Sequence, residues 1–203
     1  MIYQKCDCWY CLHEHRQIIL TFEMNGERQF WVDIPKNASQ SIKERWKMNE
    51  KPSIVPRLIY KDLDCKPLAV YRDPMSRFVS LLNHYLTYSG PYGRFLKGIS
   101  ALADIGVDAE KISLEERVSY FMGCLPKLSG FHQVHHFYPQ TYWIPKEFQE
   151  YTWVPMNKVS EVFDTENTTP GSGKITKDML TETQKDFVFS EYKDDYDYFK
   201  NML

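Results

Sequence analysis

The first segment that could do chemistry joins a predicted strand at 29–34 to a predicted helix that starts near residue 42. It reads Pro35-Lys36-Asn37-Ala38-Ser39-Gln40-Ser41. A loop that enters a helix N-terminus can wrap an anion with its backbone amides, and small residues let the backbone approach closely. Ser39 and Ser41 would add hydroxyl donors, and Lys36 a full positive charge. The segment therefore predicts an anion site, with an ordinary serine-capped turn as the alternative.

The second segment follows another predicted strand, at 67–71, and reads Arg72-Asp73-Pro74. Asp is a favoured N-cap residue and Pro is favoured in the first helical turn, so a helix begins here. At about 100° per residue, one face of this helix is apolar: Met75, Phe78, Val79, Leu82, Tyr85 and Leu86. The opposite face is polar: Asp73, Arg77, Ser80 and His84. We expect the apolar face in the core and the polar line at the carboxyl end of the strand, where open α/β sheets bind ligands.

Strands and helices alternate along the rest of the chain. Residues 18–24 read as a strand, and Asn25-Gly26 predicts a hairpin to the strand at 29–34. Residues 52–67 combine prolines with a short apolar piece, Leu58-Ile59-Tyr60. The remaining predictions are a loop with a short helix at 87–113, a helix at 114–122, a strand at 151–154, a polar loop at 164–176 and a helix from about 178.

This order of elements is typical of an α/β fold. We expect a three-layer sandwich in which helices cover both faces of a mostly parallel central sheet that carries the phosphate loop. The 203 residues fit one domain, 1–203, in which residues 1–28 form a Cys/His-rich segment and an edge hairpin.

The composition is that of an ordinary soluble domain, with 43% hydrophobic residues and a formal net charge of −2. Nothing in this balance indicates nucleic acid as a partner, so any anion site must be built locally. No apolar run reaches the roughly 18 residues that a membrane span needs, and the N-terminus lacks the apolar core of a signal peptide. We therefore expect no membrane span and a cytoplasmic location.

Both segments resemble motifs of one enzyme family. Residues 34–42 resemble the 5′-phosphosulfate loop of sulfotransferases that use 3′-phosphoadenosine 5′-phosphosulfate (PAPS), and residues 72–80 resemble their 3′-phosphate motif, Arg-Asp-Pro-x-x-Arg-x-x-Ser. The carbohydrate branch, with the chondroitin and heparan sulfate 2-O-sulfotransferases, is the most similar. Two weaker matches follow in its order: His136-Phe137-Tyr138-Pro139-Gln140 and Tyr192-x-x-Asp195-Tyr196-x-x-Phe199. The resemblance spans residues 29–200 and implies a P-loop-like phosphate loop in a fold similar to that of nucleotide kinases.

The resemblance implies PAPS as the sulfuryl donor, 3′-phosphoadenosine 5′-phosphate (PAP) as its product, and an acceptor hydroxyl, on a carbohydrate in this branch. Lys36 would contact the 5′-phosphosulfate and act on the leaving group. The donor-binding set would be Lys36, Asn37, Ala38, Ser39, Gln40 and Ser41 at the 5′ end, and Arg72 and Ser80 at the 3′-phosphate. Arg77 either belongs to this set or pairs with Asp73 one helical turn away.

The general base is the least defined catalytic group. The heparan 2-O-type relatives use a histidine between the two phosphate motifs, but this chain has none between His15 and His84. The candidates are His136, His135 and His132, or an acid between the motifs: Glu50, Asp62 or Asp64. The histidine-rich stretch is equally compatible with core packing. The chemistry requires no metal.

Two further segments have both a functional and a purely structural interpretation. The N-terminal cluster of Cys6, Cys8, Cys11, His13 and His15 could ligate zinc, hold free thiols or form a labile disulfide. Five cysteines cannot all pair within one chain, so reduced thiols are the default. Residues 171–176, Gly-Ser-Gly-Lys-Ile-Thr, look like a Walker loop, but position 168 is Thr where that loop has its first Gly, and we interpret them as a flexible loop.

Two other function classes remain open. A kinase-like enzyme would carry a Walker Lys-Ser/Thr pair for Mg²⁺ and no 3′-phosphate site. A non-catalytic module that binds PAP or polyanions would keep the phosphate contacts but tolerate the loss of Lys36.

Overall fold

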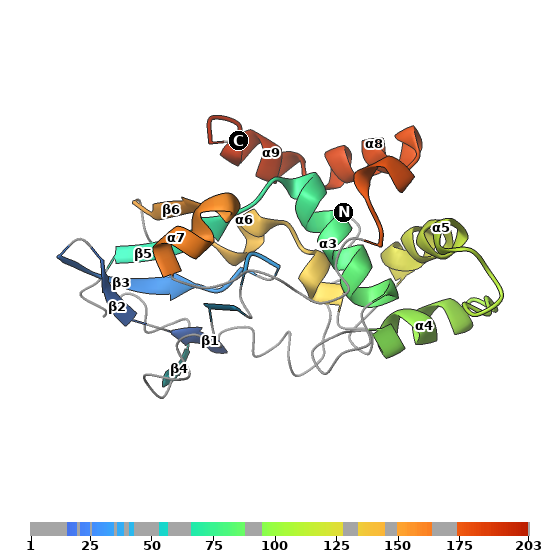
Figure 1. The fold of residues 1–203 in the computed structure, drawn as a ribbon, viewed down its shortest axis with the longest axis horizontal. Coiled ribbons are helices and arrows are strands. Elements are labelled where there is room, and N and C mark those ends of the chain that lie inside the picture. The colour runs from blue at the N-terminus through green and yellow to red at the C-terminus, as the bar shows by residue number, and fades with distance from the viewer. Residues whose placement is uncertain are drawn as a thin grey trace. The chain divides into compact units, whose positions relative to one another are not determined.

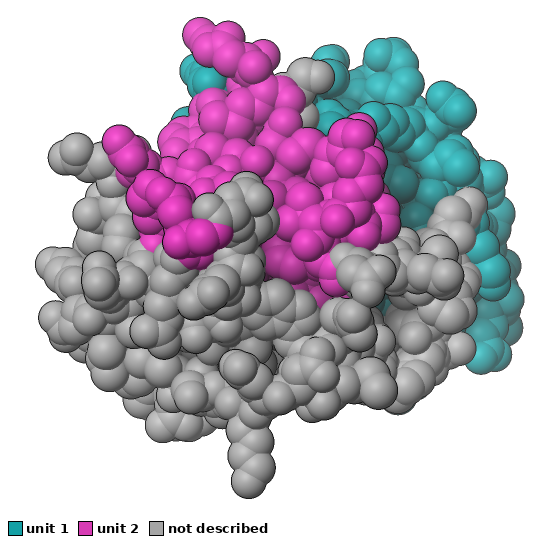
Figure 2. Space-filling view, turned by 60° about the vertical axis from the view of Figure 1, so that its left-hand side comes forward, with its two compact units in different colours: residues 1–12, 73–139, 169–197 teal, residues 13–72, 140–168, 198–203 magenta. Residues whose placement is uncertain are grey.

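The structure is a computed structural model that describes residues 16–19, 21–24, 26–34, 36–38, 41–42, 53–56, 66–87, 95–127, 134–144, 150–163 and 174–202. The chain divides into two compact units, each assembled from three stretches of sequence (Figure 2). Unit 1 contains residues 1–12, 73–139 and 169–197, and unit 2 contains residues 13–72, 140–168 and 198–203. The single domain over 1–203 stays a prediction, and the two units are described separately.

Unit 2 is built on a mixed sheet (Figure 1). Its order is β2-β3-β5-β6, in which β2 (Thr21–Met24) runs antiparallel to β3 (Glu27–Val32), and β5 (Lys66–Tyr71) and β6 (Thr152–Pro155) continue it in parallel. The α/β class is thereby confirmed. The edge hairpin is confirmed as well: Met24 pairs with Glu27 across the turn, where Gly26 takes a left-handed φ of 76°.

The predicted strand at 18–24 was wrong as a single strand. Its first part belongs to β1 (Arg16–Ile19), which pairs antiparallel with β4 (Ser53–Pro56) in a separate two-stranded sheet, while β2 joins the main sheet. Strand β4 lies in the proline-containing segment for which no strand was predicted. Pro56 is its last residue, a position where a missing N–H donor costs little.

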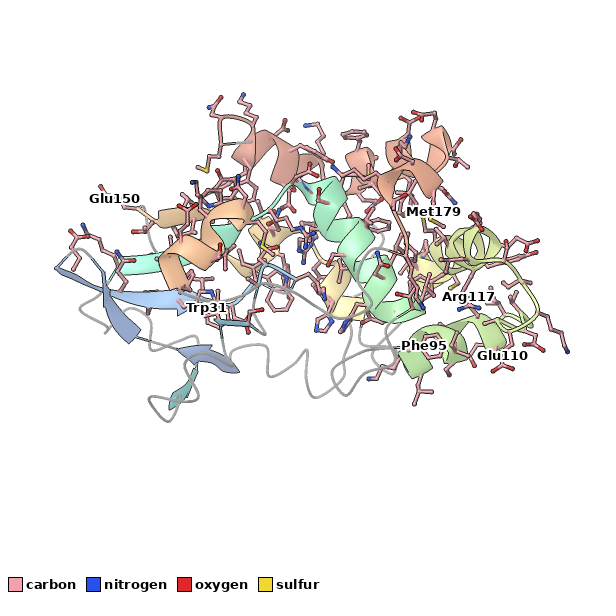
Figure 3. All side chains as sticks on the ribbon, viewed as in Figure 1. Trp31, Phe95, Glu110, Arg117, Glu150 and Met179 are labelled. Atoms are coloured by element: carbon pink, nitrogen blue, oxygen red, sulfur yellow. The ribbon has the colours of Figure 1, made fainter. Side chains whose placement is uncertain are left out.

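Side chains of β3 and β5 are buried on both faces of the main sheet, where successive strand residues point to opposite sides. Phe30, Val32, Ala69 and Tyr71 face one cluster, which includes Ile144 and Phe199. Trp31, Leu68, Val70 and Val154 face the other, which includes Ile42 and two residues of α7 (Val159–Phe163) (Figure 3). Burial on both sides is typical of parallel strands and explains why 67–71 is apolar throughout.

Unit 1 is mainly helical, and its core surrounds α3 (Pro74–Leu86). The other elements are α4 (Phe95–Ala103), α5 (Leu114–Cys124), η2 (Leu125–Lys127), η4 (Val134–Phe137), η6 (Lys177–Met179), α8 (Glu182–Glu191) and α9 (Lys193–Phe199), whose last residues enter unit 2. Gly98 allows α4 to approach α3, since a Cβ there would lie 2.1 Å from the Tyr85 carbonyl oxygen. The short helix within 87–113 and the helix at 114–122 are confirmed.

Helix α3 confirms its predicted core face but not the polar line opposite. Met75, Phe78, Val79, Leu82, Tyr85 and Leu86 are all buried. Arg77 and His84, however, are also buried, with exposed fractions of 0% and 8%. Arg77 can be buried on this face because the carbonyl groups of residues 136 and 138 accept hydrogen bonds from its guanidinium. Ser80 is partly exposed.

The terminal segment was predicted as one helix and is divided into η6, α8 and α9. A capping box at Thr181 and Gln184 starts α8, and the backbone of Tyr192 departs from helical geometry between α8 and α9. The end of the loop at 171–176 is held in place, because buried Ile175 exchanges two hydrogen bonds with the Asn83 side chain. The flexible-loop prediction was therefore wrong at this residue.

The described helices include none that is long and apolar enough to cross a membrane.

Asp73 caps the N-terminus of α3, as predicted. Its carboxylate accepts hydrogen bonds from the Ser76 amide at 2.8 Å and the Ser76 hydroxyl at 2.6 Å, and pairs with Lys177 at 2.9 Å. Burial raises the pKa of Asp73, but the hydrogen bonds from Ser76 and Lys177 outweigh it and hold this pKa below the ordinary 3.8. Burial and the negative charge of Asp73 raise the pKa of Tyr196 to about 12.

Asp73→Ala should lower the free energy of unfolding at pH 7 by about 1 kcal/mol, the usual cost of a lost N-cap. Because folding lowers the Asp73 pKa, its charge stabilises the protein above pH 3.8 and stops doing so as the pH falls through the folded value. Asp73→Asn, which keeps a capping oxygen, should cost less than Asp73→Ala. Urea unfolding at pH 7 and pH 3 measures both effects. A difference in the free energy of unfolding between Asp73→Ala and wild type that is larger at pH 3 than at pH 7 would contradict this account.

Candidate functional site

The candidate anion loop lies at the carboxyl edge of the unit 2 sheet. Strands β3 and β5 are parallel neighbours, so the loop after β3 and Arg72 after β5 emerge at the same edge. The Arg72 guanidinium Nη1 donates a hydrogen bond to the Lys36 carbonyl oxygen at 3.2 Å. Two cationic residues from the two predicted phosphate motifs, Lys36 and Arg72, therefore meet at the ends of adjacent strands.

A buried glutamine fixes this arrangement. Gln140 is the first residue of α6 (Gln140–Trp143) and has an exposed fraction of 0%. Its Oε1 accepts hydrogen bonds from Asn37 Nδ2 at 2.6 Å and from the Arg72 amide at 3.0 Å, and its Nε2 donates to the Arg72 carbonyl at 2.8 Å. One side chain thus ties the loop, the end of β5 and the start of α6 together.

Asn37 completes the connection from the loop side. Its Nδ2 also donates to the Val70 carbonyl at 2.7 Å, and its backbone amide donates to the Ile34 carbonyl at 3.1 Å. Asn37 is buried, with an exposed fraction of 1%. These donors are engaged within the protein, so the observed role of Asn37 is to lock the loop, and its contact with an anion stays a prediction.

The loop backbone has an unusual conformation. Lys36 and Ala38 have φ values of 67° and 62°, in the left-handed region that residues with a Cβ rarely occupy. Each such residue costs about 1–3 kcal/mol and persists only where its surroundings impose it. Left-handed residues that alternate with others turn neighbouring amides toward one side, which is the geometry of anion-binding nests. The helix begins directly afterwards, where the Ile42 amide donates to the Ala38 carbonyl.

The accessible groups of this site are charged or hydroxylic. Lys36, Ser41 and Arg72 are partly exposed, while Ala38 is buried against the sheet. The close approach of the backbone to an anion at the small residue Ala38 stays a prediction. Ser39 and Gln40 lie outside the described residues.

The other predicted site residues belong to unit 1. Ser80 is partly exposed on α3, and its predicted contact with the 3′-phosphate stays a prediction. His136 is partly exposed on η4, where its ring centroid lies 5.9 Å from that of His84 and 6.4 Å from that of Tyr85. The backbone of His135 belongs to η4 but its side chain is not described, and His132, Glu50, Asp62 and Asp64 lie outside the described residues.

Gln140 is the functional candidate that sequence reasoning missed. It stood at the end of the segment that resembles the carbohydrate branch, yet no role was assigned to it. The sequence feature that could have indicated its role is its position, as a polar residue two positions after Tyr138 at the start of a helix. A contact over 103 residues in sequence with Asn37 is not visible in any local pattern.

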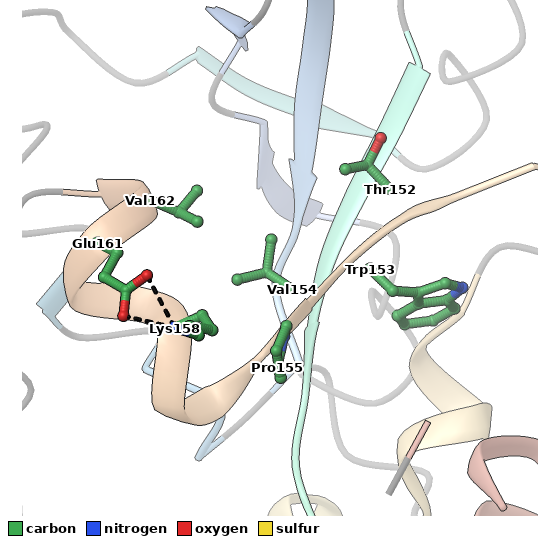
Figure 4. Close-up of a pocket in the computed structure, with 7 residues that line it drawn as sticks. All are labelled: Thr152, Trp153, Val154, Pro155, Lys158, Glu161 and Val162. Atoms are coloured by element: carbon green, nitrogen blue, oxygen red, sulfur yellow. Dashed lines mark hydrogen bonds and ion pairs between the residues drawn. The ribbon is translucent and has the colours of Figure 1, made fainter. Parts of the chain in front are cut away.

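A shallow groove of about 550 Å³ lies elsewhere on unit 2 (Figure 4). It is bordered by β6, η5 (Met156–Lys158) and α7, and an ion pair of 2.8 Å joins Lys158 to Glu161 on its η5–α7 side. Its lining does not include Lys36 or Arg72: Thr152, Trp153, Val154, Pro155, Lys158, Glu161 and Val162.

Within the described ranges, no group of three or more His, Cys, Asp or Glu side chains could hold a metal ion. The N-terminal cluster of Cys6, Cys8, Cys11, His13 and His15 lies outside these ranges, so the zinc, thiol and disulfide alternatives stay predictions.

Comparison with protein-family models, curated proteins and solved structures found no match to this chain. The likeness to sulfotransferases therefore rests on the sequence motifs.

Gln140→Ala should destabilise the protein strongly, because it removes the partners of the Arg72 amide and carbonyl and one of the two acceptors of Asn37 Nδ2. Each such group costs about 1–3 kcal/mol, so we expect a loss of about 2–4 kcal/mol in the free energy of unfolding. Urea unfolding measures it.

Gln184→Ala is the matched control, since the Gln184 side chain also bonds a backbone amide and a second side chain but sits at the partly exposed start of α8. Its loss should be about 1 kcal/mol or less. Equal losses in the two variants would show that Gln140 has no special role.

Proposed function

We propose that this chain is a PAPS-dependent sulfotransferase that transfers a sulfuryl group to an acceptor hydroxyl, on a carbohydrate by resemblance to that branch of the family. One observation carries the proposal. The loop with Lys36 and left-handed Ala38 is held by Asn37 and Gln140 against Arg72, at the carboxyl ends of two parallel strands.

The proposal includes a three-layer α/β fold with a P-loop-like phosphate loop. The burial of both faces of the β3-β5-β6 sheet supports it, as does the position of the loop between β3 and a helix that starts at Ser41. In such folds the loop after a parallel strand presents amides and a helix N-terminus to a phosphate.

Lys36 and the loop would act on the 5′ end of the donor. In sulfuryl transfer, the bond from sulfur to the bridging oxygen of the 5′-phosphate breaks while a bond to the acceptor oxygen forms. The protein contributes positioning and charge stabilisation, as in phosphoryl transfer. Negative charge grows on the bridging oxygen, and the Lys36 ammonium would neutralise it. Loop amides and Ser41 would hold the departing phosphate.

Arg72 and Ser80 would bind the 3′-phosphate, and His136 would take the proton of the acceptor hydroxyl. A guanidinium suits a phosphate because it offers two parallel N–H donors. An imidazole is suited to general-base catalysis near neutral pH, which contributes about 10²–10⁴-fold to the rate. Among the candidate bases, His136 is the one whose side chain the structure describes: the residue is partly exposed and its ring lies near that of His84.

PAP should raise the melting temperature much more than ADP at equal concentration, because only PAP carries the 3′-phosphate. At 100 times its dissociation constant a ligand stabilises the folded state by about 2.7 kcal/mol, which corresponds to about 5–10 °C for a chain of this size. Differential scanning fluorimetry with both nucleotides measures the shift. Equal shifts would argue for a kinase-like site or a general polyanion site.

Lys36→Ala should reduce kcat for sulfuryl transfer from radiolabelled PAPS by about 10²–10³-fold, the usual effect of removing a group that stabilises developing charge. The melting temperature without ligand should change little, because the Lys36 side chain is partly exposed.

Lys158→Ala is the control, since it also removes an exposed lysine from unit 2 but at the β6–α7 groove. A Lys36→Ala enzyme that turns over like wild type would remove this lysine from the mechanism. Binding of PAP without any transfer in the wild type would favour the non-catalytic module.

A further inference from the structure

A fully buried arginine in unit 1 has a role that the anion site does not account for. Arg77 on α3 has an exposed fraction of 0%, although a buried charge is costly unless hydrogen bonds satisfy it. Its Nη1 donates to the Tyr138 carbonyl at 2.9 Å and its Nη2 donates to the His136 carbonyl at 2.9 Å. The two arms of the guanidinium therefore hold the backbone on both sides of Phe137.

The turn that Arg77 holds has little support of its own. Helix η4 (Val134–Phe137) is a single short 3₁₀ turn, and such turns have few internal hydrogen bonds. Its position depends on neighbours: Tyr192 donates from its hydroxyl to the Phe137 carbonyl, and the Phe137 ring packs against Phe78 and Tyr85. Three consecutive carbonyls, those of residues 136, 137 and 138, are thus fixed by side chains from α3 and from the C-terminal helices.

The fixed backbone also places the side chain of His136. Its ring lies against His84 and Tyr85, which come from the last turns of the same helix that carries Arg77. His136 is a partly exposed residue, whereas the neighbouring His84 is buried. Arg77 and the histidine pair therefore form one assembly, in which a backbone contact at one end sets the position of a ring at the other.

We propose that Arg77 is a positioning residue for His136 and does not contact the donor itself. Full burial and the engagement of both terminal nitrogens by carbonyls argue against a direct contact with a phosphate. The consequence for catalysis rests on the proposed function, in which His136 accepts the proton of the acceptor hydroxyl. The structural part of the proposal, that Arg77 sets the place of the His136 ring, stands independently of that function.

Arg77→Lys tests the proposal, because lysine keeps the charge but cannot reach both carbonyls in the fork geometry of a guanidinium. Arg117→Lys is the matched control (Figure 3). Arg117 lies on α5 in the same unit and also donates to two backbone carbonyls, those of Leu86 and Ala109, but not to η4. Both variants lose hydrogen bonds from a guanidinium to two backbone carbonyls, although Arg117 is partly exposed and Arg77 is buried, so the contacts of the His136 ring are the readout that separates them.

The first measurement uses no substrate. In protein with labelled histidines, ring-to-ring nuclear Overhauser effects should connect His84 and His136 both in the wild type and in the control variant, Arg117→Lys. Arg77→Lys should lose these effects while the contact of His84 with Tyr85 remains. Preservation of the His84–His136 contact in Arg77→Lys would overturn the proposal.

The second measurement is a double-mutant cycle on kcat with PAPS. Arg77→Lys should lower kcat about 10–100-fold with an unchanged affinity for PAP, and the same change in a His136→Ala background should have no further effect. Additive losses, or a weakened affinity for PAP, would show that Arg77 acts elsewhere. If the wild type transfers no sulfuryl group, the proposed function fails while the ring contacts still decide the role of Arg77.

If Arg77→Lys does not fold, the proposal is tested on the wild-type protein. A guanidinium held by two carbonyls should give separate, slowly rotating Nη–H signals close to the Phe137 backbone, as Arg117 should near its own partners. Rapid rotation of the Arg77 guanidinium would overturn the proposal.

Discussion

The carboxamide of Gln140 is the contact on which the candidate site depends. It accepts from Asn37 and from the Arg72 amide and donates to the Arg72 carbonyl, and both Gln140 and Asn37 are buried. A buried amide is costly when unpaired, so these three bonds specify one geometry for the loop and the end of β5. The left-handed residues Lys36 and Ala38 flank Asn37, and such residues persist where their surroundings impose the conformation.

The same stretch of chain, residues 136–140, supports both halves of the proposed chemistry. In unit 1 its carbonyls accept from Arg77 and Tyr192, which fixes the turn that carries His136. In unit 2 its last residue is the glutamine that holds the candidate anion loop. In this stretch Phe137 is a buried core residue and Gln140 a buried hydrogen-bonding residue, while His136 is the proposed general base.

Local rules predicted most elements of this fold. Asp73-Pro74 predicted the start of α3, Asn25-Gly26 the hairpin, and the apolar run after Lys66 the buried strand β5, because each depends on neighbouring residues alone. The wrong predictions concern features that depend on contacts with distant parts of the chain. The burial of Arg77 depends on carbonyls about 60 residues away, the split of 18–24 on pairing with β4, and the role of Gln140 on Asn37. The anion loop was predictable as a position between strand and helix, but not the left-handed backbone or the clamp that holds it.

A crystal structure of the full chain with PAP tests the central claim most directly. The account predicts the 5′-phosphate within hydrogen-bonding distance of the amides of residues 38–41 and of the Lys36 ammonium, with Gln140 still bound to Asn37 and Arg72. It also predicts the 3′-phosphate at Arg72 and Ser80. PAP bound at another place, such as the groove beside β6, or a loop that rearranges and releases Gln140 when PAP binds, would contradict it.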